Sequence, residues 1–96
     1  MAQKVGFSFS IVEMQAVAEK SISIAIVEDI RDIRDGLTTL INFTEGFECN
    51  GSYRSMEDAI PKIKGNVPDV LLSDIGLPGM DGIEGIKILK ELYPEM

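Results

Sequence analysis

Apolar and polar residues follow one another along this chain in blocks that predict strands and helices in turn. Three short apolar segments, near Ile22–Glu28, Phe47–Tyr53 and Val70–Asp74, have the length and composition of β-strands. Each is followed by a segment whose apolar residues recur every three or four positions, which is typical of a helix packed on one face. This order predicts the α/β class, a parallel sheet flanked by helices.

The three expected helices are defined by different signals. Gly46 marks the end of the first helix and Pro94 closes the last. The middle helix starts at Ser55, whose hydroxyl and Asp58 three residues later resemble a capping box. Pro61 lies inside this helix, and because its ring and missing N–H disturb the preceding turn, we expect a kinked or shortened helix. The apolar stripes of the two outer helices are Ile30, Ile33, Leu37, Leu40 and Ile41, and Ile83, Ile86, Leu89 and Leu92.

The order of the strands in the sheet follows from the handedness of the connections. Right-handed crossovers in a doubly wound sheet predict the order 2-1-3, with the first strand in the middle. The third strand is continuously apolar, as expected of a strand buried on both faces. The carboxyl ends of the first and third strands would then meet at the topological switch point, where such folds bind ligands.

Residues 1–20 give an ambiguous pattern. Val5, Phe7 and Phe9 alternate as in a strand, whereas Phe7 and Ile11 are also spaced as in a helix. Two interpretations stay open: a flexible leader, or an added element that packs on an exposed edge or on a partner chain.

Length and composition narrow the class of protein. The chain has 96 residues and can hold one small domain. Its net charge of −7 argues against direct contact of this segment with nucleic acid or an anionic membrane, and no apolar run is long enough to span a bilayer. A single cysteine, Cys49, and the absence of histidine exclude an internal disulfide and a zinc site of the usual spacing. We therefore expect a cytoplasmic protein.

Acidic residues follow two of the predicted strands. Glu28 and Asp29 end the first strand and Asp74 ends the third. Because the carboxyl ends of parallel strands lie side by side, three carboxylates would meet and repel one another unless a cation relieves them. Mg²⁺ is the first candidate because it accepts carboxylate and backbone oxygens and keeps several waters. The alternative is that Asp29 caps the next helix and the other two acids are solvated strand ends.

Three segments together resemble the receiver domain of bacterial two-component response regulators: Val27-Glu28-Asp29, Leu71-Leu72-Ser73-Asp74 and Leu77-Pro78-Gly79-Met80-Asp81-Gly82. The resemblance covers Ser21 to Met96, and residues 1–20 lie outside it. It implies a flavodoxin-like, doubly wound parallel sheet. A receiver normally continues with two more strands and helices that carry a Ser or Thr and a Lys. The chain is therefore expected to be a partial receiver domain, truncated after the third strand and third helix.

The resemblance also implies roles for individual residues. Asp74 matches the phosphoacceptor aspartate, and Glu28 and Asp29 match the acidic pair that binds Mg²⁺ together with it. Gly76 matches the position whose backbone carbonyl also ligates the metal. Glu28 stands where aspartate is commoner, and its longer arm still permits ligation through water. Asp81 is expected to be the N-cap of the following helix, with no metal role.

The function implied is that of a signalling module, not an enzyme. A sensor histidine kinase would transfer a phosphoryl group to Asp74, and the output would be transcriptional, through a domain beyond this chain. The alternative is a truncated or degenerate receiver that acts as a non-phosphorylated interaction module, as a homodimer or with a domain-swapped partner. A metal-dependent phosphatase is a weaker hypothesis, because Gly76 stands where such an enzyme needs a second aspartate.

Overall fold

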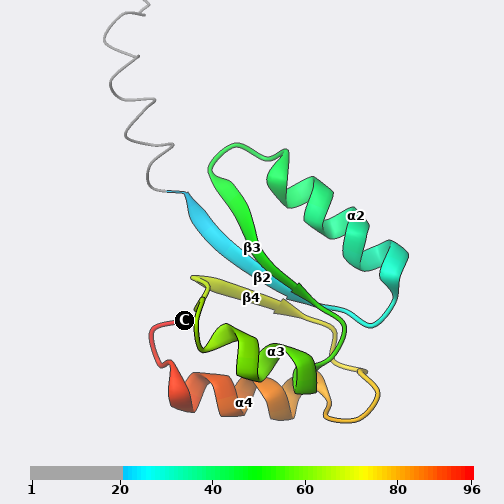
Figure 1. The fold of residues 1–96 in the computed structure, drawn as a ribbon, viewed down its shortest axis with the longest axis vertical. Helices are drawn as coiled ribbons and strands as arrows, with labels where there is room; N and C mark the ends of the chain where they lie inside the picture. The colour runs from blue at the N-terminus through cyan, green and yellow to red at the C-terminus, as the bar shows by residue number, and fades with distance from the viewer. Residues whose placement is uncertain (1–20) are drawn as a thin grey trace, which may run out of the picture.

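The computed structural model describes residues 21–96 as a three-stranded parallel sheet with helices on both faces (Figure 1). Its elements are β2 (Ile22–Val27), α2 (Arg31–Asn42), β3 (Phe47–Tyr53), α3 (Met56–Ile63), β4 (Val70–Ser73) and α4 (Gly82–Leu92). The strand order is β3-β2-β4, so the first strand lies in the middle, and the expected α/β fold with its 2-1-3 order is confirmed. The expected leader or added element at residues 1–20 lies outside the described residues.

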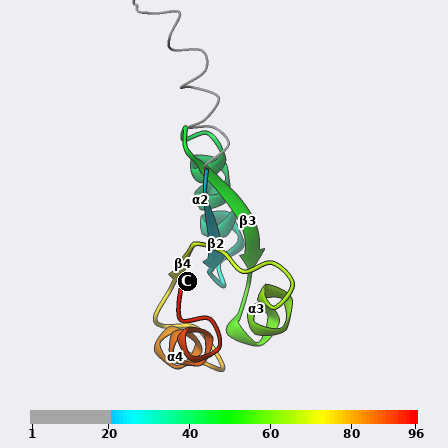
Figure 2. The ribbon, with the colours of Figure 1, turned by 90° about the vertical axis from the view of Figure 1, so that its left-hand side faces the viewer.

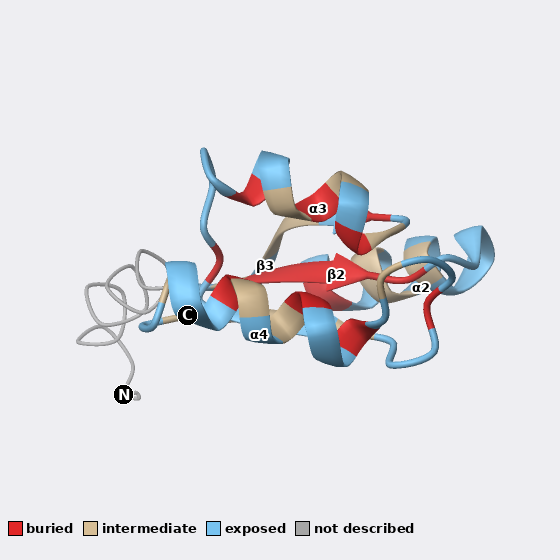
Figure 3. Cartoon of the chain, turned by 90° about the horizontal axis from the view of Figure 1, so that it is seen from below, coloured by how far each residue is buried: buried red, intermediate tan, exposed pale blue. Residues whose placement is uncertain are grey.

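The helices cover the two faces of the sheet unequally. Helix α2 lies on one face, and α3 and α4 lie together on the other (Figure 2). Because side chains alternate along a strand, Ala25 and Val27 of β2 face α3 and α4, whereas Ile24 and Ile26 face α2. The larger core lies on the α3–α4 face (Figure 3) and contains Ala25, Val27, Tyr53, Met56, Ala59, Ile63, Leu77 and Leu89. The smaller core contains Ile24, Ile26 and Ile41.

Two of the three helices begin with the side-chain caps that the sequence predicts. The Ser55 hydroxyl accepts a hydrogen bond from the Asp58 amide at 3.0 Å, and the Asp81 carboxylate accepts one from the Glu84 amide at 2.8 Å. Helix α3 contains Pro61 and ends after eight residues, as expected of a shortened helix. Among residues 21–96, no helix has the length and apolar character that a membrane span requires.

The end of α2 differs from the expectation. The helix ends at Asn42, and Gly46 lies in the turn that leads into β3. Gly46 has a φ of 89°, a conformation that favours glycine, and its carbonyl accepts a hydrogen bond from the Ile22 amide at 2.8 Å. Gly46 therefore links the start of β3 to the start of β2 through this hydrogen bond and does not cap α2.

The third strand has the apolar composition of a strand buried on both faces, but among the described residues it is covered on one face only. Val70 and Leu72 are 40% and 43% exposed, whereas Leu71 packs against the larger core. Within residues 21–96, β4 pairs only with β2 and forms an edge of the sheet. An apolar sequence makes a strand suitable for burial on both faces. Burial also requires that another element of the fold packs on each face of that strand.

At the amino end of the sheet, hydrogen bonds join Ser23 of β2 to Asp69, the residue before β4. The Asp69 carboxylate accepts hydrogen bonds from the Ser23 amide at 2.9 Å and from the Ser23 hydroxyl at 3.1 Å. The Asp69 amide in turn donates to the Ser23 carbonyl at 3.0 Å and to its hydroxyl at 2.9 Å. These four bonds fasten together two segments that are 46 residues apart in the chain.

Candidate functional site

The three acids predicted to form the site leave the sheet at its carboxyl end. Glu28 directly follows β2 and Asp74 directly follows β4. The Glu28 amide donates to the Tyr53 carbonyl at 2.9 Å, and the Asp74 amide donates to the Val27 carbonyl at 3.0 Å. Each bond continues the pairing of its strand by one residue, so the sheet itself fixes the backbone of both acids.

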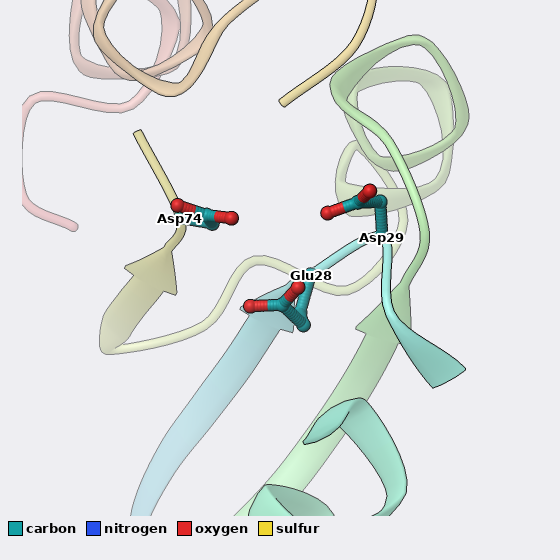
Figure 4. Close-up of side chains that lie close together, drawn as sticks. All are labelled: Glu28, Asp29 and Asp74. Atoms are coloured by element: carbon teal, nitrogen blue, oxygen red, sulfur yellow. The ribbon is translucent and has the colours of Figure 1, made fainter. Parts of the chain in front are cut away.

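The side chains of Glu28, Asp29 and Asp74 gather at one point. One carboxylate oxygen of each lies within 4.8 Å of the corresponding oxygens of the other two. Asp29 and Asp74 point toward one another, and Glu28 lies between them (Figure 4). Glu28 is buried, while the other two acids are exposed. The structure therefore brings together the acids that the sequence predicts to be neighbours.

Backbone amides orient two of these carboxylates. The Ile30 amide donates to Glu28 Oε2 at 3.1 Å, and the Gly76 amide donates to Asp74 Oδ1 at 3.1 Å. Asp29 does not cap α2, since the N-cap position is Ile30 and no side chain caps the helix. Gly76 thus contacts the Asp74 carboxylate through its amide, and the metal-binding role of the Gly76 carbonyl stays a prediction.

Arg34 is a residue of the site that the sequence reasoning did not single out. Its Nη1 donates to the backbone carbonyl of Glu28 at 2.8 Å and to that of Asp29 at 3.4 Å. A signal was present, because Arg34 lies four residues after Ile30 and three before Leu37, on the stripe of α2 that faces the sheet. A single charged side chain on such a stripe needs a polar partner nearby.

The acids fit a hard divalent cation. Their donor set consists only of carboxylate oxygens, the ligands that Mg²⁺ prefers, and the exposure of Asp29 and Asp74 leaves room for water ligands. A cavity of about 270 Å³ adjoins the cluster, with Glu28 and Asp74 among its polar lining and Leu37 and Leu72 among its apolar lining. The cluster is thus open to solvent at Asp29 and Asp74 and borders apolar side chains.

The loop that follows Asp74 is anchored at two points before α4 begins. Leu77 is buried in the larger core, and the Met80 amide donates to Glu57 Oε2 at 2.9 Å. The Met80 hydrogen bond is the main reason that the pKa of the Glu57 carboxyl lies below its usual value. Gly79 has a φ of 74°, and a Cβ at this position would collide with the Glu57 carboxylate. Glu57 is the second residue near the site that the sequence reasoning missed.

Comparison with known proteins places this arrangement in a family. The response regulator receiver domain family matches residues 24–96. Among the relatives, the protein-glutamate methylesterase/protein-glutamine glutaminase of Halalkalibacterium halodurans is 36% identical over 76 residues, 79% of this chain and 22% of that protein. The DNA-binding transcriptional regulator NtrC of Proteus hauseri is 39% identical over 71 residues, 74% of this chain and 15% of that protein.

A third relative is the transcriptional regulatory protein LnrK of Bacillus subtilis, 32% identical over 75 residues, which are 78% of this chain and 34% of that protein. The matched segment therefore spans about a third or less of the length of these curated relatives. Since the family match begins within β2 and extends beyond α4, it includes both strand ends that carry the acids. The chain belongs to the response regulator receiver domain family.

Proposed function

We propose that this chain receives a phosphoryl group from a sensor histidine kinase on the carboxylate of Asp74. The observation that carries the proposal is the position of Asp74, exposed at the carboxyl end of β4 with two further carboxylates within 4.8 Å. An exposed carboxylate can reach a donor on another protein, and the neighbouring acids supply a site for the cation that such a transfer requires.

The transfer is a displacement at phosphorus. A carboxylate oxygen of Asp74 forms a new P–O bond while the P–N bond of the kinase's phosphohistidine breaks, and the released imidazole nitrogen takes a proton from solvent. Asp74 Oδ1 accepts a hydrogen bond from the Gly76 amide. This bond orients the carboxylate and leaves Oδ2 available for attack. The product is an acyl phosphate, which places additional negative charge at the end of β4.

Mg²⁺ would be held by the carboxylates of Glu28, Asp29 and Asp74, with the backbone carbonyl of Gly76 as a further ligand. When bound, the ion neutralises charge on the transferring group and holds it in line with the nucleophile. Glu28 contributes from a buried position where the Ile30 amide fixes its carboxylate. Asp29 and Asp74 approach from the exposed side.

The relatives suggest how such a module is used. NtrC and LnrK are named as transcriptional regulators, whereas the relative from Halalkalibacterium halodurans is named as a methylesterase and glutaminase. We infer a transcriptional output for this protein, in the cytoplasm, with DNA contacts made by another segment because this one carries a net charge of −7. The described segment itself acts as a phosphoacceptor.

The test is intact mass spectrometry of the full-length protein after incubation with acetyl phosphate and Mg²⁺. We expect one phosphoryl adduct, which is lost in Asp74→Asn and when EDTA removes the metal. Asp81→Asn is the matched control, since asparagine is also a good N-cap and this variant should keep the adduct. An adduct that persists in Asp74→Asn, or none in the unchanged protein, would contradict the proposal.

The outer edge of β4 favours one alternative, an interaction module that works without phosphorylation. Within residues 21–96 β4 is an edge strand whose Val70 and Leu72 are substantially exposed on the α2 face, and an apolar edge strand is a surface on which another chain can pair. This alternative predicts no adduct on Asp74 and a dimer whose mass, measured by light scattering, falls to that of a monomer in Leu72→Lys. A monomer that carries the adduct would exclude it.

A further inference from the structure

The connection between β2 and α2 carries two of the three acids of the site, and beyond the hydrogen bond of the Glu28 amide to β3 few contacts hold its shape. The N-cap residue of α2 is Ile30, and no side chain caps the helix there. Asp29 is exposed, and Ile30 is 52% exposed. Within the described residues, the hydrogen bonds between side chains and the backbone of this connection are the one that the Ile30 amide donates to the Glu28 carboxylate and the two that Arg34 donates.

Arg34 holds this connection from the first turn of α2. Its Nη1 donates to two consecutive carbonyls, Glu28 at 2.8 Å and Asp29 at 3.4 Å, while its own amide donates to the Ile30 carbonyl at 2.9 Å. A donor shared by two successive carbonyls restrains the orientation of both peptide planes. The peptide planes in turn set the direction in which the side chains of Glu28 and Asp29 leave the backbone.

We propose that Arg34 is a positioning residue for the metal site, which acts by fixing the backbone of Glu28 and Asp29 so that both carboxylates face Asp74. The inference rests on the proposed function, in which these acids hold Mg²⁺. Arg34 bonds backbone carbonyls and no carboxylate of the cluster, so it leaves the three carboxylates available to the cation.

Charge and positioning predict opposite results when Arg34 is replaced. A positive charge near the cluster repels a divalent cation, so if charge alone mattered, removal of Arg34 would strengthen Mg²⁺ binding. If positioning matters more, the loss of the two carbonyl contacts disorders the acidic pair and weakens binding. The sign of the change in affinity therefore separates the two roles.

Helix α2 also supplies a matched control. Arg31 belongs to the same helix, its side chain is 83% exposed, and it pairs with Asp35 at 3.7 Å. Arg31→Gln and Arg34→Gln remove the same charge from the same turn of helix, but only the second removes the contacts to Glu28 and Asp29. A difference between the two variants is then due to those contacts.

The experiment is an NMR titration of the full-length protein with Mg²⁺, followed on the amides of Ile30 and Gly76. For Arg34→Gln we expect the dissociation constant for Mg²⁺ to rise about tenfold or more, the range seen when groups that orient metal ligands are lost. Arg34→Lys keeps the charge and one donor nitrogen, so its dissociation constant for Mg²⁺ should lie between those of the unchanged protein and Arg34→Gln. Arg31→Gln should leave the affinity unchanged.

A second readout needs no metal. The Ile30 amide is bonded to the Glu28 carboxylate, so its hydrogen exchange should become faster in Arg34→Gln and Arg34→Lys but not in Arg31→Gln. If Arg34→Gln does not fold, the Mg²⁺ affinity and the Ile30 exchange rate of the conservative variant Arg34→Lys test the positioning role.

Two failures can be told apart. If the unchanged protein binds no Mg²⁺, the proposed function is wrong, and the exchange of the Ile30 amide alone decides whether Arg34 holds the connection. If the unchanged protein binds Mg²⁺ and the Arg34 variants bind it equally or more tightly, the positioning role is overturned.

Discussion

The two faces of the sheet are built differently, although both are crossed by the same central strand. On the face covered by α3 and α4, side chains from all three strands and both helices enclose a continuous core. On the other face, α2 contributes a single buried residue, Ile41, while Ile33, Leu40 and Phe43 are 48%, 63% and 86% exposed. Within residues 21–96, most of the hydrophobic stabilisation therefore comes from one face.

The two acidic strand ends of the candidate site are supported differently. Asp74 is followed by a loop that Leu77 anchors in the larger core, so the Asp74 side of the site is held by the well-packed face. Glu28 and Asp29 lead into α2, which shares only the smaller apolar core with the sheet, and polar contacts from Arg34 hold the backbone there. The Asp74 side therefore has apolar packing in addition to its hydrogen bonds, whereas the Glu28–Asp29 side relies mainly on hydrogen bonds.

Truncation of one isoleucine in a helix on each face tests the comparison most strongly. Ile63 of α3 is fully buried, and Ile63→Ala should lower the free energy of unfolding by about 2–5 kcal/mol. Ile33→Ala on α2 should cost no more than about 0.5 kcal/mol, as at other exposed positions. Urea unfolding of the full-length protein measures both, and equal losses would mean that α2 is as well covered as α3 in the complete protein.

Two helical glycines should respond with opposite signs to the same substitution. A Cβ on Gly85 of α4 would collide with the Met56 side chain, so Gly85→Ala should destabilise the protein by about 1–3 kcal/mol. A Cβ on Gly36 of α2 would meet no atom within 4 Å, so Gly36→Ala should stabilise it by about 0.5–1 kcal/mol through helix propensity. Thermal unfolding of both variants is the measurement, and a loss of stability in Gly36→Ala would contradict the open surface of α2.

The smallest effect concerns the hydrogen bond between Glu57 and the loop. Because the pKa of the Glu57 carboxyl is lowered in the fold, its contribution to stability is present above the usual value of 4.5 and is lost as the pH falls through the lower, folded pKa. The Met80 amide should report this titration as a change in NMR chemical shift below pH 4.5. In Glu57→Gln the change should disappear, and a shift that titrates at or above 4.5 would argue against the bond.

Features that depend on the order of strands were predictable from the sequence. Apolar runs locate β2 and β4, and the handedness of crossovers makes them neighbours, so the meeting of Glu28, Asp29 and Asp74 follows without knowledge of any side-chain contact. The roles of these acids in metal binding and phosphotransfer stay predictions until the experiments above are done.

Features that depend on side-chain reach were not predictable in the same way. Arg34 and Glu57 act on backbone groups of other segments, and the spacing of residues does not show where a long flexible side chain ends. The apolar composition of β4 likewise does not give the exposure of Val70 and Leu72, because composition describes a strand's own surface and not the neighbours that would cover it.

The four hydrogen bonds between Ser23 and Asp69 have a consequence at the opposite end of the sheet. They lock the register in which β4 pairs with β2, so that Val27 lies beside Ser73 and the next residue, Asp74, turns toward the acidic pair. A slip of one residue would reverse the face of every side chain in β4 and turn Asp74 away from Glu28 and Asp29. Since β4 has only four residues, alignment at its start determines whether the three carboxylates meet at its end.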